Sequence, residues 1–175
     1  MQAQSITGIT NVAGNIPKNP SPQFKVALSY INYVFSGQFE TLSTILSDDF
    51  QYTTLPQTLG QDRPALGKEE ALATMEFFLS VVKKENFVAT IHETLEGPNG
   101  VVLHITSKGT CVSGSPYAND YIFWINVKQV GGGLKVAAVK EVMDSKYTID
   151  FVEMEHPALF AIEADRVMKA MGAKL

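Results

Sequence analysis

The chain has 175 residues, 45% of them hydrophobic and 18% charged, with a formal net charge of −4. This length and composition fit one globular domain with a full hydrophobic core. The acidic balance argues against a nucleic-acid reader, which usually carries a basic stripe, and no run of 18 apolar residues is available to cross a membrane.

The first 22 residues show no periodic pattern. They are rich in Ser, Thr, Asn, Gly and Pro, and they lack the basic end and the apolar block of a signal peptide. We therefore interpret residues 1–22 as a flexible arm and expect a cytoplasmic protein. The main domain is expected over 23–150 and a C-terminal helical extension over 151–175.

Helices are predicted in the first half of the chain. The first begins at Ser21, an N-cap followed by proline, carries apolar residues at helical spacing and stops at Gly37. A short second helix follows, and then a strand over 50–55. A third helix is predicted over 68–84, with two glutamates in its first turn and two lysines in its last.

The second half changes to the period of strands. Strands are predicted over 87–96, 101–111, 119–130 and 134–144, and a last helix over 157–171. Helices followed by a run of strands predict an α+β fold, in which a curved antiparallel sheet wraps around the N-terminal helices. The last two strands are apolar on both faces, so the second face needs a cover, either the C-terminal helix or a second subunit. We expect a homodimer.

Three segments of the chain carry a family resemblance. They read YINYVFSGQFETLSTILSDDF (30–50), LGKEEA (66–71) and, within 120–144, DYIFWINVK and LKVAAVKEVMD. Together they resemble the nuclear transport factor 2-like superfamily, the cone-shaped fold of ketosteroid isomerase, scytalone dehydratase and SnoaL-like polyketide cyclases. That fold hosts isomerases, dehydratases, cyclases and non-enzymes, so the resemblance implies a fold and leaves the chemistry to the residues.

The resemblance implies a role for Tyr30. This tyrosine precedes Gly37 by seven residues, as does the oxyanion-binding tyrosine of ketosteroid isomerase. Thr54 falls at the position of that enzyme's aspartate base. The enzyme's second oxyanion-binding residue is an aspartate, and its position here falls among Tyr121, Phe123 and their neighbours, none of which is an acid on the same face. The steroid isomerase reaction is therefore not expected here.

The closing hairpin provides a candidate acid. Its odd-numbered residues form one face, and Glu141 is the one acid on that face. If this face lines the pocket, as the resemblance implies, desolvation raises the pKa of Glu141 toward neutrality and suits it to general acid/base work. Pocket lining without catalysis and a solvated place at the rim stay open. The expected substrate-binding residues are Tyr52, Thr54, Tyr121, Phe123 and Met143.

Residues 93–106 look like a hairpin with a histidine on, or just before, each arm. Pairing Leu95 with Val101 leaves a five-residue turn, places His92 opposite His104 and keeps most apolar residues on one face. The resemblance puts both histidines on the outer, partner-facing side. A catalytic zinc needs a third protein ligand, so we expect no metal; a structural role and an acid/base role stay open.

Two aspartates complete the secondary candidates: Asp120, and Asp144, for which a turn or cap is the simpler role. We expect a cofactor-independent isomerase, dehydratase or cyclase that binds a small apolar organic molecule. Tyr30 would polarise a carbonyl and Glu141 would move the proton. The alternative is a non-catalytic ligand-binding or dimeric accessory module of the same fold.

Overall fold

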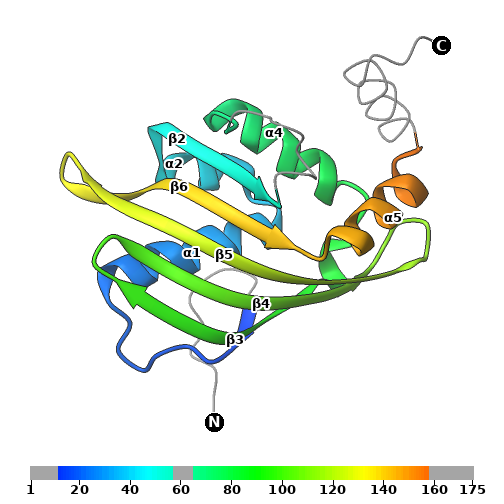
Figure 1. Cartoon of the computed structure of the whole chain (residues 1–175), viewed down its shortest axis with the longest axis horizontal. Coiled ribbons are helices and arrows are strands. Elements are labelled where there is room, and N and C mark those ends of the chain that lie inside the picture. Colours follow the sequence, from blue (N-terminus) through cyan, green and yellow to red (C-terminus); the bar gives the residue numbers. More distant parts are fainter. Residues whose placement is uncertain (1–11, 57–64, 158–175) are drawn as a thin grey trace.

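The computed structural model describes residues 12–56 and 65–157, and a curved mixed sheet with helices on one side forms its centre (Figure 1). The strand order is β1-β3-β4-β5-β6-β2. In chain order the elements are β1 (Val12–Gly14), α1 (Pro22–Ser36), α2 (Phe39–Ile45), β2 (Leu46–Leu55), α4 (Lys68–Leu79), the short 3-10 helix η1 (Lys84–Asn86), β3 (Val88–Gly97), β4 (Gly100–Thr110), β5 (Pro116–Val130), β6 (Gly133–Met143) and α5 (Ser145–Glu155).

The sheet is antiparallel in its middle and parallel at its edges. Strands β3, β4, β5 and β6 pair antiparallel, as predicted, whereas β2 joins β6 in parallel and β1 joins β3 in parallel. The predicted α+β class is confirmed, and the sheet is open rather than closed into a barrel. The pairing of β2 with β6 brings the first half of the domain against its closing strand.

Helix α1 crosses the inner face of the sheet and begins and ends where its capping residues predict. The Ser21 hydroxyl accepts a hydrogen bond from the Phe24 amide at 3.0 Å, and Gly37 takes the left-handed conformation with φ 66° that favours glycine at this position. The Ser21 hydroxyl also donates to the carboxylate of Glu96 on β3. The start of α1 is thereby tied to the β3–β4 hairpin.

Two expectations about the helices need correction. Helix α4 ends at Leu79 rather than at residue 84, because Val82 leaves the helix to form a bridge with Cys111. The segment after β6, for which no separate helix was predicted, forms α5 from Ser145. The last predicted helix, 157–171, lies outside the described residues from position 158 on, and so do residues 1–11 of the predicted arm.

A bulge changes the register of the β3–β4 hairpin. Ile91 pairs with Ile105 as predicted, but Glu93, and not His92, then pairs with His104. Pairing continues to Gly97 and leaves a two-residue turn, so the predicted five-residue turn is wrong. The extra residue keeps Glu93 off the apolar inner face, where the uninterrupted register would have placed it opposite Leu103.

The core lies between the inner face of the sheet and helices α1, α2 and α4. Its largest fully buried side chains include Phe24 and Tyr30 of α1, Phe50 of β2 and Phe87, which precedes β3. Across residues 12–56 and 65–157, every helix is too short or too polar to span a bilayer.

Two isoleucines test how much the α1 contact contributes to stability. Ile31 is fully buried under the sheet, whereas Ile149 on α5 is 46% exposed. We expect Ile31→Ala to lower the free energy of unfolding by about 3 kcal/mol, and Ile149→Ala by less than about 0.5 kcal/mol. Urea denaturation followed by circular dichroism at one protein concentration measures both. Equal losses would contradict the packing described here.

Candidate functional site

Glu141 lies on the inner face of the sheet, among apolar neighbours. The strand register sets it beside Phe123 of β5 on one side and Thr54 of β2 on the other. The residue is only 8% exposed, and on β5 the odd-numbered side chains from Tyr117 to Val127 are buried with it. The prediction that the closing hairpin turns an isolated carboxyl inward is confirmed.

Alternation along β6 is interrupted by a second bulge. The register shifts between Asn126 and Val127 of β5, so Val136, and not Ala137, is the buried residue in the first half of β6. From Val139 onward the odd-numbered residues face inward. Glu141 therefore has the predicted orientation, although the prediction for Ala137 is wrong.

Tyr52 is the hydrogen-bond partner of this carboxyl. Its hydroxyl donates to Oε2 of Glu141, and its side chain is 6% exposed. The backbone of Tyr52 is fixed as well, since it exchanges hydrogen bonds of 2.9 and 2.8 Å with Leu66, just before α4. The phenol is therefore held by the parallel pairing of β2 with β6 and by the chain that enters α4.

Tyr30 approaches the same carboxyl from α1. Burial, and secondly the charge of Glu141, raise the pKa of Tyr30 well above its usual value. Its hydroxyl lies 3.9 Å from Sδ of Met75, a weak acceptor. Tyr52 thus contacts Glu141, and Tyr30 lies within range of the charge of Glu141; the three residues come from three separate elements.

Burial raises the pKa of Glu141 from 4.5 to about 8. The physical cause is desolvation, which disfavours the ionised carboxylate in an apolar environment. A carboxyl with this pKa is mostly protonated at neutral pH and can still ionise. Because Oε2 accepts the Tyr52 hydrogen bond, the ionised form is also stabilised.

The other expected substrate-binding residues also face inward. Tyr121 lies beside Met143 in the cross-strand row next to that of Glu141, and its ring stacks on Phe123 with centroids 5.4 Å apart. Tyr121 and Phe123 on β5 flank the carboxyl on one side. Tyr52 and Thr54 on β2 flank it on the other.

Tyr117 also belongs to this face, and it was not predicted from the sequence. Its hydroxyl shares a hydrogen bond with that of Tyr121, and burial raises the pKa of both phenols. Ser107, on the adjacent strand, is buried beside these two phenols. The odd-numbered pattern of β5, extended back from residue 121, predicts that Tyr117 faces inward as well.

The two histidines lie on the opposite, outer face of the sheet. Their ring centroids are 5.1 Å apart, which confirms that they are neighbours. Nε2 of His92 is 2.7 Å from Oγ1 of Thr106, and Nε2 of His104 is 2.8 Å from Oδ1 of Asp120. Among residues 12–56 and 65–157, no group of three or more metal-ligating side chains is assembled.

Asp144 has a structural role at the end of β6. Its carboxylate accepts a hydrogen bond of 3.0 Å from the Tyr147 amide and caps α5. Its own amide donates to the carbonyl of Asp120. The backbones of Asp120 and Asp144 are therefore neighbours.

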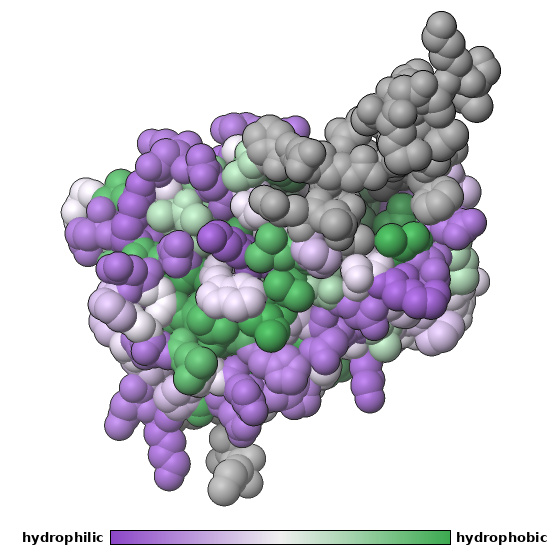
Figure 2. Space-filling model, in the orientation of Figure 1, coloured by the Kyte–Doolittle hydropathy of each residue, from purple (hydrophilic) through white to green (hydrophobic). Residues whose placement is uncertain are grey.

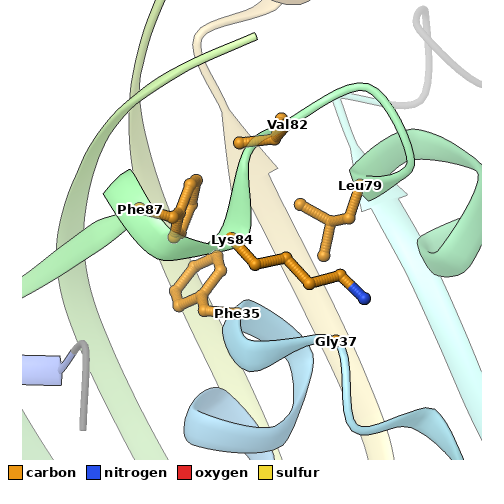
Figure 3. A pocket seen from close by; sticks show the side chains of 6 residues that line it. All are labelled: Phe35, Gly37, Leu79, Val82, Lys84 and Phe87. Carbon is orange, nitrogen blue, oxygen red and sulfur yellow. The ribbon is translucent and has the colours of Figure 1, made fainter. Parts of the chain in front are cut away.

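A small apolar crevice opens at the C-terminal end of α1 (Figure 3). It is lined by Phe35, Gly37, Leu79, Val82, Lys84 and Phe87 and has no room for a bound molecule. The rings of Phe35 and Phe87, 5.1 Å apart, pack between this crevice and the tyrosines of β5. The crevice is thus separate from the Glu141 cluster.

Comparison with known proteins rests on structure alone. No protein-family model matches the sequence, and no curated protein matches it. Many solved structures share the fold. An NTF2-like protein of unknown function from Burkholderia pseudomallei superposes with a TM-score of 0.58 at 12% identity, over 78% of this chain and 98% of its own. The chain has the nuclear transport factor 2-like fold.

Two fungal proteins share this nuclear transport factor 2-like fold. AusH from Aspergillus nidulans superposes with a TM-score of 0.60 at 22% identity, over 73% of this chain and 88% of its own. The BvnE pinacolase from Penicillium brevicompactum gives a TM-score of 0.61 at 17% identity, over 79% of this chain and 99% of its own. At these identities the comparisons establish the fold, and the chemistry has to come from the side chains.

The raised pKa of Glu141 predicts a specific pH dependence of stability. A carboxyl whose pKa is higher in the folded than in the unfolded chain stabilises the fold fully below pH 4.5, and this stabilisation is lost as the pH rises to about 8. Relative to Glu141→Gln, the wild-type free energy of unfolding should fall by up to about 1.4 kcal/mol per pH unit in that window. Chemical denaturation at several pH values measures it.

The exposed Glu153 of α5 provides the matched control. Glu153→Gln should follow the wild-type curve at every pH. If the wild type and Glu141→Gln instead give parallel stability curves between pH 4.5 and 8, the carboxyl of Glu141 is not held in the desolvated environment described above.

Proposed function

We propose that this protein is a cofactor-independent isomerase, dehydratase or cyclase that uses Glu141 to move a proton on a small, mostly apolar organic molecule. One observation carries the proposal: a buried carboxyl with a pKa of about 8, hydrogen-bonded to Tyr52, on an apolar face of the sheet. Structural ion pairs also shift pKa values, but within the described residues no cation is paired with this carboxyl.

Glu141 has the properties of a group that gives and takes back a proton. With a pKa of about 8, about a tenth of the molecules carry the ionised carboxyl at pH 7, so both forms are available in turnover. The protonated form can donate to a substrate oxygen or carbon. The hydrogen bond from Tyr52 then stabilises the carboxylate that remains, until it accepts a proton from the substrate.

Tyr30 suits the role of an electrophilic donor. Because its pKa is raised, the phenol keeps its proton and does not act as a base. Its present contact, the sulfur of Met75, is a weak acceptor, so a substrate carbonyl can replace that contact at little cost. Polarising a carbonyl with Tyr30 while Glu141 moves the proton is the simplest use of the pair.

A ligand-binding module without chemistry is the second candidate, and Thr54 favours it. This threonine lies on β2, beside Glu141 of β6. It occupies the position where the resemblance to ketosteroid isomerase implied an aspartate base. A site with one carboxyl has one proton-transferring group rather than two. The pinacolase named above has the same fold and an enzymatic activity, which supports the enzyme over the module by analogy only.

Exchange of substrate protons with solvent tests the enzyme proposal without knowledge of the natural substrate. A panel of apolar cyclic and linear ketones is incubated with protein in D2O, and deuterium uptake next to the carbonyl is followed by mass spectrometry. We expect Glu141→Gln to lose at least about 100-fold in exchange rate, because the proton carrier is gone. Glu153→Gln, with an exposed glutamate, is the control and should exchange like the wild type.

Tyr52→Phe sharpens the test. Removing the hydroxyl that stabilises the carboxylate should raise the pKa of Glu141 further and move the pH profile of exchange to higher pH, while exchange itself persists. Exchange that is unchanged in Glu141→Gln would remove Glu141 as the proton carrier. Ligands that raise the melting temperature of the wild type but never exchange would favour the binding module.

A further inference from the structure

A second group of polar side chains lies on the inner face of the sheet, away from Glu141. The hydroxyls of Tyr117 and Tyr121 share a hydrogen bond, and Ser107 of β4 lies beside both phenols. All three side chains are buried, since each is at most 8% exposed. These three residues are called the hydroxyl cluster below. The proton transfer proposed at Glu141 uses none of their hydroxyls.

The hydroxyl cluster has more protons to donate than it can use within itself as a chain. Two hydrogen bonds link three hydroxyls in a chain and use two of their three protons. The neighbouring Asn119 is a poor acceptor for the third, because its Oδ1 already accepts from the amides of Asp120 and Asp144 at 2.8 and 3.2 Å. A ligand oxygen would give this third proton an acceptor.

Packing does not require these hydroxyls. The rings of Phe151 and Phe87 lie against Tyr117 with centroids 5.0 and 5.7 Å apart, and Phe123 stacks on Tyr121. Phenylalanine would make the same ring contacts, whereas burial of a hydroxyl costs free energy unless the hydroxyl is hydrogen-bonded. A few polar groups that converge on an otherwise apolar surface are typical of a ligand-binding site.

An apolar stretch of β5 separates the hydroxyl cluster from Glu141. The carboxyl pairs with the row of Phe123, whereas the hydroxyls of Tyr117 and Tyr121 meet between positions 117 and 121. At about 3.3 Å per residue, the two polar groups are on the order of 10 Å apart along the strand. The ring of Phe35 lines this stretch, 6.0 Å from that of Tyr121 and 6.2 Å from that of Phe123. A ligand that reaches both ends carries two oxygens about this far apart.

Neither polar group suits a charged ligand. Figure 2 shows hydrophilic residues at the edges of the outer face of the sheet. By contrast, the buried polar side chains of residues 12–56 and 65–157 include no lysine or arginine, and desolvation lowers the pKa of the buried His156. A ligand carboxylate or phosphate on the inner face would lose its hydration without gaining a cation, and it would repel Glu141 in its ionised form.

We propose that the hydroxyl cluster is a second anchor for the substrate, and that the substrate is a neutral molecule with an oxygen group at each end. One carbonyl meets Tyr30 and Glu141, and the second oxygen accepts a hydrogen bond from the hydroxyl cluster. Burial raises the pKa of both phenols of the cluster, so they keep their protons and act as donors. The inference rests on the proposed function for the first end, and the second end decides which carbonyl reaches Glu141.

Three matched probes test the second anchor by binding alone. The first, 4-cyclohexylcyclohexanone, has one ketone. The second, bicyclohexyl-4,4'-dione, has another ketone at the far end, about 10 Å from the first. The third, 4-(4-oxocyclohexyl)cyclohexanecarboxylic acid, has a carboxyl there. Titration of the full-length protein at pH 7, followed by proton NMR, gives the three dissociation constants.

We expect the dione to bind at least about 10-fold more tightly than the monoketone, because its second oxygen gains a hydrogen bond to the hydroxyl cluster. The acid should bind no more tightly than the monoketone, because its carboxylate would be buried without a cation. Equal affinities for the dione and the monoketone, or a dione that does not bind, overturn the second anchor. Tighter binding of the acid than of the dione overturns the neutral substrate class.

Substitutions within the hydroxyl cluster locate the contact. Tyr121→Phe and Ser107→Ala should each reduce the preference for the dione over the monoketone to less than about 3-fold, since each removes a single hydroxyl. Ser107→Ala keeps the test available if Tyr121→Phe does not fold. Tyr33→Phe is the matched control, because this partly buried tyrosine of α1 lies outside the hydroxyl cluster, and it should keep the full preference.

Urea denaturation of the same variants separates a binding role from a structural one. A structural role predicts a lower free energy of unfolding with an unchanged preference for the dione, and a preference that survives both Tyr121→Phe and Ser107→Ala overturns the proposal. Glu141→Gln separates the second anchor from the chemistry. This variant should lose proton exchange and keep the preference for the dione, so exchange can fail in the wild type while the second anchor stands.

Discussion

The site depends on one constraint: a carboxyl has to be buried in an apolar interior. An ionised carboxylate there is costly, so the fold shifts the pKa of Glu141 upward and supplies a phenol as hydrogen-bond donor. The carboxyl, the Tyr52 phenol and the Tyr30 phenol come from β6, β2 and α1. The parallel pairing of β2 with β6 and the crossing of α1 under the sheet are therefore what assemble the cluster.

Alternation along the strands made part of this site predictable. A strand with one face in the core repeats with period two, so the inward orientation of Glu141, Phe123 and Tyr121 follows from their odd numbers. The ends of α1 were predictable for a similarly local reason, since Ser21 and Gly37 each satisfy a backbone requirement of a helix end. These features need only neighbouring residues.

Long-range contacts and single-residue irregularities were not predictable in the same way. The hydrogen bond between Tyr52 and Glu141 joins residues 89 apart in sequence. No local sequence pattern indicates which strands become neighbours in the sheet. The bulge at His92 preserves the apolar face by adding a residue, which a regular alternation rule cannot represent. Helix α5 was missed although a cap was expected at Asp144, because no helix was assigned to the residues that follow this cap.

The hairpin bulge has a consequence for where the chain tolerates insertions and deletions. All five residues from 93 to 97 are paired with β4, so a deletion among them changes which side chains meet α1 and which face outward. Deletion of His92, the extra residue, leaves an uninterrupted ladder of strand pairs, and every other side chain of the hairpin keeps its inward or outward orientation. Length variation in this hairpin is thus confined to His92 and to the two turn residues, Pro98 and Asn99.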